Sequence, residues 1–307
     1  MAVIFIFVDG VGAGARDPAV NPLAARDFLL SRFADGSGPA LPRGARAVLA
    51  DATLGVPGRP QSATGQTSIL TGENAPRLIG KHLLGFPNPA LRSLLKERSL
   101  FRDLAAAGRS AVFANAYPVA HLRALGLPCE GEPEFSDPVR RRRARASATT
   151  VAVDAGGYRL RTWSEARGGA ALTHDIHGER ANGYGAGLPP RRPEDAAAIL
   201  LRLAAEHDFA MFEFFETDEA GHARDRDAAL EALDRLDAFL RPVVGGLGDG
   251  DALVVASDHG NVEDLSTRNH TCAPVPVLGF GRAAERLDAV RDLTGIAPLL
   301  KGLVLER

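Results

Sequence analysis

The sequence predicts an α/β fold with a largely parallel central sheet, helices on both faces and a small inserted cap. Apolar runs typical of buried parallel strands alternate with segments of helical periodicity along the chain. Three of these runs are followed by Asp or His, at the sheet edge where open α/β folds bind their ligands. The chain has 307 residues, of which 45% are hydrophobic, enough for one large core with an insertion.

Composition narrows the classes of partner. The formal net charge of −2 gives no reason to expect nucleic acid or an anionic membrane as a general partner. No apolar run approaches the length of a membrane span, and the N-terminal run has no signal-peptide character. Cys129 and Cys272 are the only cysteines, which suits a reducing compartment and free thiols. We therefore expect a cytoplasmic protein that acts on a small molecule.

The first strand is predicted at Val3 to Val8, an uninterrupted run of β-branched, aromatic and aliphatic residues. Asp9 and Gly10 close it, which places an acid at the tip of a central strand. The following GVGAG lacks the third glycine of a dinucleotide-binding fingerprint at the right spacing, so nicotinamide binding is set aside. A second short strand is predicted within Ala45 to Leu54.

A short helix is predicted from Ser62 to the residue before Gly72, with Ser62 as its N-cap. The same position suits a phosphoryl nucleophile, because the N–H groups at a helix start bind phosphate oxygens and a hydroxyl beside a metal loses its proton more easily. Thr64 and Thr67 are competing hydroxyls, and Gln66 could donate a hydrogen bond to a phosphate. A capping serine without further function is the alternative interpretation.

The pattern of apolar residues in the middle of the chain predicts an insertion. Leu94 to Ala107 has the pattern of an amphipathic helix, and Ser110 to Asn115 that of a buried strand. Clear periodicity is then lost over residues 118–190. We predict that these residues form a small cap and that residues 1–117 and 191–307 form the core.

Positive charge in the predicted cap is concentrated in the run Arg140 to Arg143. Arginine forks match phosphate oxygens, so Arg141 and Arg143 are predicted to hold an anionic substrate, with a solvated helix face as the alternative. Lys81 is a further candidate for a phosphate contact. The cluster THDIH, from Thr173 to His177, is interpreted as polar cap surface or a substrate contact, since no further metal ligand is adjacent.

Beyond the cap, a helix is predicted over Pro193 to Ala205 and a strand over Phe209 to Phe215. Asp218 and His222 follow at a four-residue spacing, so one helical turn brings both to the same side. A long helix with leucines at helical spacing is expected over Ala223 to Val244 and covers the sheet.

The last strands complete the predicted sheet. An apolar run beginning at Val254 ends abruptly in Asp258 and His259, His270 follows eleven residues later, and Val275 to Phe280 forms a final short strand. Six candidate ligands are too many for one tetrahedral zinc and suit two divalent ions, zinc or manganese. The six are Asp9, Asp218, His222, Asp258, His259 and His270.

Five pieces of sequence, in this order, resemble the alkaline phosphatase superfamily: Asp9-Gly10, SATGQTSILTG, DEAGH, SDHGNVED and His270-Thr271. Within that superfamily they are most similar to the branch of cofactor-independent phosphoglycerate mutase and phosphopentomutase. The resemblance implies that Ser62 is the nucleophile and divides the metal ligands into two sets. One set is Asp9, Ser62, Asp258 and His259, and the other is Asp218, His222 and His270.

The resemblance implies two-metal phosphoryl transfer through a serine. We expect hydrolysis of a phosphomonoester or phosphodiester, because the insertion is short for a cap that must retain and reorient an intermediate. The alternatives are a phosphomutase acting on a sugar phosphate or phosphoglycerate, and a non-catalytic metal-binding protein of the same fold. A sulfatase is disfavoured, since no CxPxR-like sequence surrounds Ser62.

Overall fold

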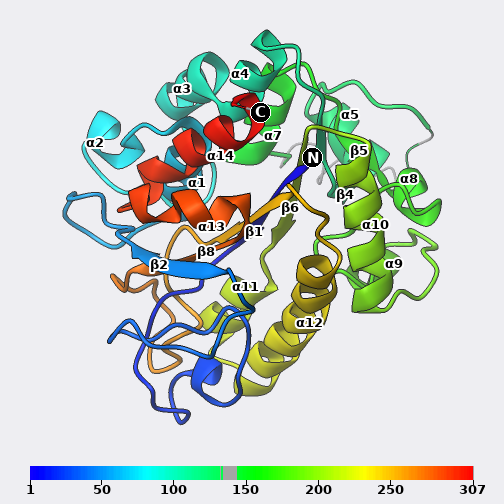
Figure 1. The fold of residues 1–307 in the computed structure, drawn as a ribbon. Helices are drawn as coiled ribbons and strands as arrows, with labels where there is room; N and C mark the ends of the chain where they lie inside the picture. The colour runs from blue at the N-terminus through cyan, green and yellow to red at the C-terminus, as the bar shows by residue number, and fades with distance from the viewer. Residues whose placement is uncertain (132, 134–143, 307) are drawn as a thin grey trace.

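The computed structural model describes residues 1–131, 133 and 144–306 of the chain (Figure 1). Arg141 and Arg143 lie outside this description. The centre of the fold is a six-stranded sheet with the strand order β2-β8-β7-β1-β6-β3. The strands are β1 (Val3–Val8), β2 (Arg46–Ala50), β3 (Ala111–Phe113), β6 (Phe209–Phe214), β7 (Ala252–Ala256) and β8 (Val275–Gly281).

The predicted α/β class and largely parallel sheet are confirmed. Strand β1 lies between β6 and β7 and runs parallel to both, and β3 is parallel to β6. Strand β8 is the exception, because it is antiparallel to both β7 and β2. The carboxyl ends of β1, β6 and β7 therefore meet at one edge, where the predicted ligands follow the strands.

Alternate side chains of β1 pack into two separate hydrophobic cores, one on each face of the sheet. Ile4, Ile6 and Val8 pack with one group of helices, and Val3 and Phe5 point into the opposite core; all are buried. Helices thus cover both faces, as Figure 1 shows. The first face carries α10 (Pro193–Ala205) and α12 (Arg226–Gly245), and the second carries α1 (Ser62–Thr71), α4 (Leu100–Ala106), α7 (Ala148–Ala155), α13 (Arg282–Arg286) and α14 (Ile296–Leu305).

The single helix predicted over Leu94 to Ala107 is wrong. Two helices occupy this region, α3 (Pro89–Arg98) and α4, and the extended backbone of Ser99 separates them. The Ser99 side chain accepts a hydrogen bond from the Arg102 N–H and so caps α4. Ser99 therefore ends α3 and begins α4, although the apolar pattern continues across it.

A small separate parallel pair joins β4 (Ala116–Tyr117), at the end of the predicted core segment, to β5 (Arg161–Thr162) within the predicted cap. Helix α7 instead packs against α1, α3 and α4 and buries Val151 and Val153 in the second core. The boundaries 118 and 190 therefore stay a prediction. The remaining helices of this segment are α5 (Val119–Ala124), α8 (Trp163–Arg167) and α9 (Glu179–Asn182).

No helix of the described residues is long and apolar enough to span a membrane. Both Cys129 and Cys272 are free thiols, as predicted. Helix α2 (Ala75–Ile79) packs against α1, and α11 (Glu216–Ala223) packs against α12.

Candidate metal centre

The carboxyl end of β1 brings Asp9 against α11. Gly10, the next residue, has φ of 72°, a conformation that glycine adopts without strain. A Cβ added to Gly10 would lie 2.7 Å from the Cβ of Asp218. Glycine is therefore required at this position both for the turn and for the close approach of the two segments.

Helix α1 presents Ser62 to the same edge. The hydroxyl of Ser62 lies 3.1 Å from Nε2 of His259. The predicted N-cap role is wrong, because Gln61 is the N-cap and Ser62 is the first helical residue. Its side chain turns toward His259 instead of back to the helix, while Gly72 ends the helix in the left-handed conformation as predicted.

The competing hydroxyls of α1 do not face this site. Thr64 donates to the carbonyl oxygen of Gln61, and Thr67 donates to that of Ala63. Both threonines are fully buried. Of the three hydroxyls considered in this helix, Ser62 is the one beside the candidate metal ligands.

Asp218 and His222 lie one turn apart on α11, as predicted, with Oδ2 of Asp218 3.3 Å from Nε2 of His222. His270, on the loop after β7, joins them, since its Nε2 lies 3.5 Å from Oδ1 of Asp218. Three residues predicted to share one ion are therefore in mutual contact.

The two histidines of this group are oriented by backbone carbonyls. The ring Nδ1 of His222 lies 2.7 Å from the carbonyl oxygen of Arg268, and that of His270 lies 2.9 Å from that of Pro60. A carbonyl oxygen only accepts, so each Nδ1 carries a proton, and the tautomer this selects has its lone pair on Nε2. These two Nε2 atoms are 3.1 Å apart, an arrangement that needs a cation or a proton between them.

The second group joins Asp9, Asp258 and His259. Nε2 of His259 lies 3.2 Å from Oδ1 of Asp9 and 3.5 Å from Oδ2 of Asp258. Burial and repulsion between the carboxylates raise the pKa of both acids well above its usual range, and burial lowers the pKa of His259 well below its own. The group is therefore strained electrostatically when no cation neutralises it.

Buried polar atoms without hydrogen-bond partners also indicate a cation site. Among the described residues, Oδ1 of Asp9, both carboxylate oxygens of Asp258 and Nδ1 of His259 have no hydrogen-bond partner. Buried polar atoms without partners cost free energy unless another group satisfies them. Carboxylate oxygens and imidazole nitrogens are ligands of zinc and manganese, so the donor set fits a divalent ion.

Atoms of these residues approach closely enough for two ion sites, which share His259. One geometric group is Asp218, His259 and His270, and the other is Asp9, Asp258 and His259. The ring of His259 also stacks on that of His270, with centroids 3.7 Å apart. The structure thus brings all six predicted ligands and Ser62 together, and the division of ligands between two ions belongs to the proposal below.

Two residues of this site were not predicted. The Asn261 side chain donates to Oδ1 of Asp218 at 2.7 Å, and Glu263 accepts from the N–H groups of Gly12 and Asn261 at 2.9 and 2.7 Å. Thr271 also donates to Glu263. These contacts fasten the loops that carry Asp9, Asp258 and His270 to one another. Asn261 and Glu263 both lie inside the SDHGNVED segment, but their roles depend on contacts with Asp218 and Gly12, which are distant in sequence.

The predicted substrate contacts fall on two sides of the centre. Gln66 lines a cavity that also reaches Asp9 and Ser62. Lys81 lines a separate groove with Arg59 and His82, beside His222 and His270. The groove is positively charged, so it suits an anionic part of a substrate.

The residues of the THDIH cluster have two different surroundings, a hydrogen-bonded turn and the wall of a cavity. Asp175 accepts hydrogen bonds from the N–H groups of Gly178 and Arg180 at 3.2 and 2.9 Å and pairs with His177, so it organises a turn. His174 instead lines the cavity that reaches Ser62, and the substrate contact considered from the sequence stays a prediction.

Removal of divalent ions is expected to lower the Tm, with a larger decrease at about pH 7.5 than at about pH 5.5. The raised pKa of Asp9 and of Asp258 means that the metal-free fold retains protons there, which compete with metal at lower pH. Each ion present at about 100 times its Kd should contribute about 2.7 kcal/mol. Scanning calorimetry with metal and with chelator at both pH values measures the difference, and equal Tm values throughout would contradict a cation site.

Comparisons with known proteins agree with this geometry. A sequence model of the Metalloenzyme superfamily matches residues 187–302. The chain is 37% identical over 118 residues to the 2,3-bisphosphoglycerate-independent phosphoglycerate mutase of Halobacterium salinarum, a match that covers 35% of this chain and 23% of that protein. It is 45% identical over 67 residues to the phosphopentomutase of Methylobacterium nodulans, covering 22% and 16%. The matches thus span less than a quarter of each mutase.

The fold is similar to that of the alkaline phosphatase of Thermus thermophilus, with a TM-score of 0.57 and 14% sequence identity over 99% of this chain and 91% of that one. At this identity the likeness concerns the fold alone. Together the comparisons confirm the resemblance to the alkaline phosphatase superfamily that the sequence motifs predicted.

Proposed function

On the premise that this chain is related to the metalloenzymes of the alkaline phosphatase superfamily, we propose that it catalyses metal-dependent phosphoryl transfer through Ser62. The observation that carries the proposal is the position of the Ser62 hydroxyl, 3.1 Å from Nε2 of His259 and beside two groups of carboxylates and imidazoles. A nucleophile next to a cation site is the arrangement that phosphoryl transfer through a covalent intermediate requires.

Two divalent ions, zinc or manganese, are proposed at this centre. Asp9, Asp258, His259 and Ser62 would hold one, and Asp218, His222 and His270 the other. Bound ions would neutralise charge on the phosphate oxygens and favour the ionised form of the Ser62 hydroxyl near neutral pH.

The residues of the chain define the steps. The Ser62 hydroxyl releases its proton to solvent, and its oxygen attacks phosphorus and forms a P–O bond as the bond from phosphorus to the substrate oxygen breaks. The departing oxygen takes a proton from solvent, so the organic part leaves as an alcohol. The first N–H groups of α1 and the amide of Gln66 bind the phosphate oxygens. Water then attacks the phosphorus on Ser62 and regenerates the Ser62 hydroxyl, and the product that leaves is inorganic phosphate from a monoester or a phosphomonoester from a diester.

Hydrolysis is the favoured outcome, because the segment predicted as a cap is short for retaining and reorienting a phosphorylated intermediate. Transfer to a second alcohol, as in a phosphomutase, is the alternative, and the two curated relatives described above are mutases. Both outcomes share the first step at Ser62, so they differ only in the final acceptor.

The test is an assay of the full-length protein, loaded with zinc or manganese, against a panel of phosphomonoesters and phosphodiesters. Metal-dependent release of inorganic phosphate from a monoester, or of an alcohol and a phosphomonoester from a diester, supports hydrolysis. An isomeric phosphate ester without phosphate release supports a mutase. Absence of both reactions across the panel would contradict phosphoryl transfer and favour a non-catalytic metal-binding protein.

A further inference from the structure

A cavity of about 640 Å³ opens directly from the candidate nucleophile. Asp9, Ser62 and Gln66 line one end, and His121 and Trp163 lie among the residues that line the rest. This volume is within the range that encloses a drug-sized ligand. The organic part of a substrate whose phosphate lies at Ser62 would extend into this space.

Aromatic rings form much of the wall of this cavity. The His174 ring lies 5.2 Å from that of Tyr117 in an edge contact and 4.5 Å from that of Phe215, while His121 stacks on Tyr117 at 5.8 Å. Phe86 lies at the exposed mouth, with the guanidinium of Arg145 4.4 Å from its ring centroid. Such surfaces suit a flat ring that stacks or makes edge contacts.

The charge on this wall disfavours an anionic organic group. Burial lowers the pKa of His174 to about 3 and also lowers that of His121, so both rings are neutral. Among the described lining residues Arg145 is the cation, and it is exposed at the mouth. A carboxylate such as that of a phosphoglycerate would meet aromatic rings and the side chain of Glu213 inside.

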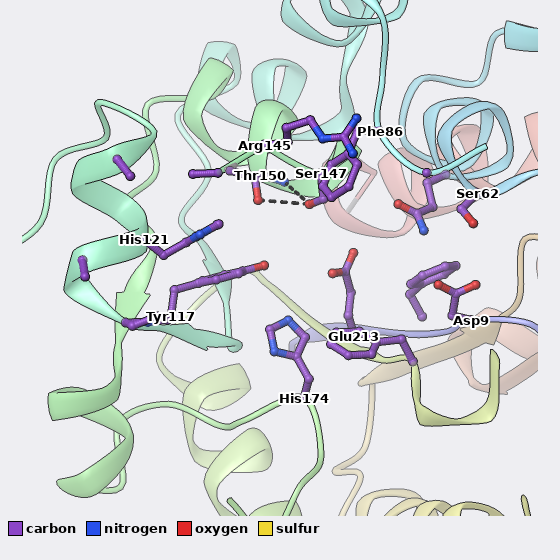
Figure 2. A pocket seen from close by; sticks show the side chains of 18 of the residues that line it. Asp9, Ser62, Phe86, Tyr117, His121, Arg145, Ser147, Thr150, His174 and Glu213 are labelled. Carbon is purple, nitrogen blue, oxygen red and sulfur yellow. Dashed lines mark hydrogen bonds between the residues drawn. The ribbon is translucent and has the colours of Figure 1, made fainter. Parts of the chain in front are cut away.

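Glu213 provides a hydrogen-bond acceptor inside the cavity. Burial raises the pKa of its carboxyl group to about 7, so the ionised form accepts hydrogen bonds above that pH. Figure 2 shows its carboxyl group pointing into the cavity between Ser62 and Asp9 on one side and Tyr117 and His121 on the other. Glu213 is 6% exposed, and one of its carboxyl oxygens, Oε1, accepts a hydrogen bond from the hydroxyl of Thr149. Within the described part of the chain no group donates to Oε2. An N–H group on a bound ring would satisfy it.

Resting on the proposed function, we infer that the substrate is a phosphate ester whose organic part is uncharged and carries a planar aromatic ring with N–H donors. Nucleoside monophosphates have this chemistry. The phosphate lies at Ser62, the ring lies among the aromatic side chains of the cavity, and Glu213 accepts from the ring. These aromatic side chains are Phe86, Tyr117, His174 and Phe215. A glycerate or pentose phosphate leaves most of the aromatic wall unused.

Substrate preference is the first test. The metal-loaded protein is assayed with purine and pyrimidine nucleoside 5′-monophosphates, ribose 5-phosphate and 3-phosphoglycerate. We expect kcat/KM for at least one nucleotide to exceed that for ribose 5-phosphate at least about tenfold, the contribution of one base stacked on an aromatic side chain. Equal or higher values for ribose 5-phosphate or 3-phosphoglycerate would overturn the inference and leave the proposed function intact. No turnover of any ester would overturn both.

A binding measurement gives a readout independent of turnover. Trp163 is the single tryptophan of the chain and lines the cavity, so its fluorescence reports on occupancy. Titration of metal-loaded Ser62→Ala with the preferred nucleotide should give a saturable change. Adding Phe86→Ala should weaken that binding about tenfold, and adding Glu213→Gln should weaken it as well.

Leu78→Ala is the matched control, because Leu78 is an exposed apolar side chain on α2 that does not line the cavity. Its binding curve should coincide with that of the parent. Unchanged affinity in both Phe86→Ala and Glu213→Gln, or a titration that ribose 5-phosphate reproduces at the same concentration, would overturn the assignment of the cavity.

Discussion

Ser62→Ala is expected to keep the fold and the bound ions and to lose at least about 10³-fold in kcat, the scale on which loss of a nucleophile acts. The Ser62 hydroxyl forms the new bond to phosphorus in the proposed first step. No neighbouring hydroxyl replaces it, because Thr64 and Thr67 donate to backbone carbonyls of the same helix. Steady-state kinetics with a preferred ester, beside metal analysis, measures both effects.

Thr64→Val provides the matched control in the same helix. It removes a buried hydroxyl and should cost about 1 kcal/mol of stability while kcat stays within a few-fold of the parent. If Ser62→Ala retained near-normal kcat, Ser62 would have no role in bond formation and direct attack by water would replace the proposed first step.

Asp258→Asn is expected to remove one ion from the protein and to abolish most of the activity. The substitution keeps the shape of a fully buried side chain and removes its negative charge. With metal bound, the variant should be less stable than the parent. With chelator the order reverses, because the variant lacks a buried carboxylate whose pKa is raised by burial and by repulsion from Asp218. The Tm of the variant should therefore be lower than that of the parent with metal and higher without it.

Asp264→Asn is the control for this pair of measurements. Asp264 lies six residues further along, and its carboxylate accepts from the backbone and hydroxyl of Ser266 outside both ligand groups. This variant should retain the full metal content and activity. An Asp258→Asn protein with the same metal content and kcat as Asp264→Asn would exclude Asp258 as a ligand.

Much of the sheet could be predicted from sequence because buried parallel strands have a local signature. The apolar runs at Val3 and Phe209 correspond to β1 and β6 almost residue for residue. The reversed direction of β8 has no such signature, since it depends on how Val275–Gly281 pairs with strands far away in sequence. The break at Ser99 was missed because apolar residues continue with helical spacing on both sides of it.

The candidate metal ligands could be predicted because Asp9, Asp258 and His259 directly follow recognisable strands, and Asp218 and His222 follow the next one at helical spacing. His270 lies further from a strand and was identified by its place after the SDHGNVED segment. Glu213 was missed because it lies within the strand β6 itself, in a run of aromatic residues. The aromatic cavity had no local signal either, since its rings come from Phe86, Tyr117, His174 and Phe215 on separate segments. Only the fold brings these residues together.

The stereochemical course at phosphorus tests the central claim most directly. The proposed route comprises two in-line displacements, one by Ser62 and one by the final acceptor, and each inverts the configuration. A phosphate ester made chiral at phosphorus by oxygen isotopes and sulfur should therefore give a product with overall retention, whether water or a second alcohol accepts the group. Overall inversion would mean a single direct displacement and would contradict a covalent intermediate on Ser62.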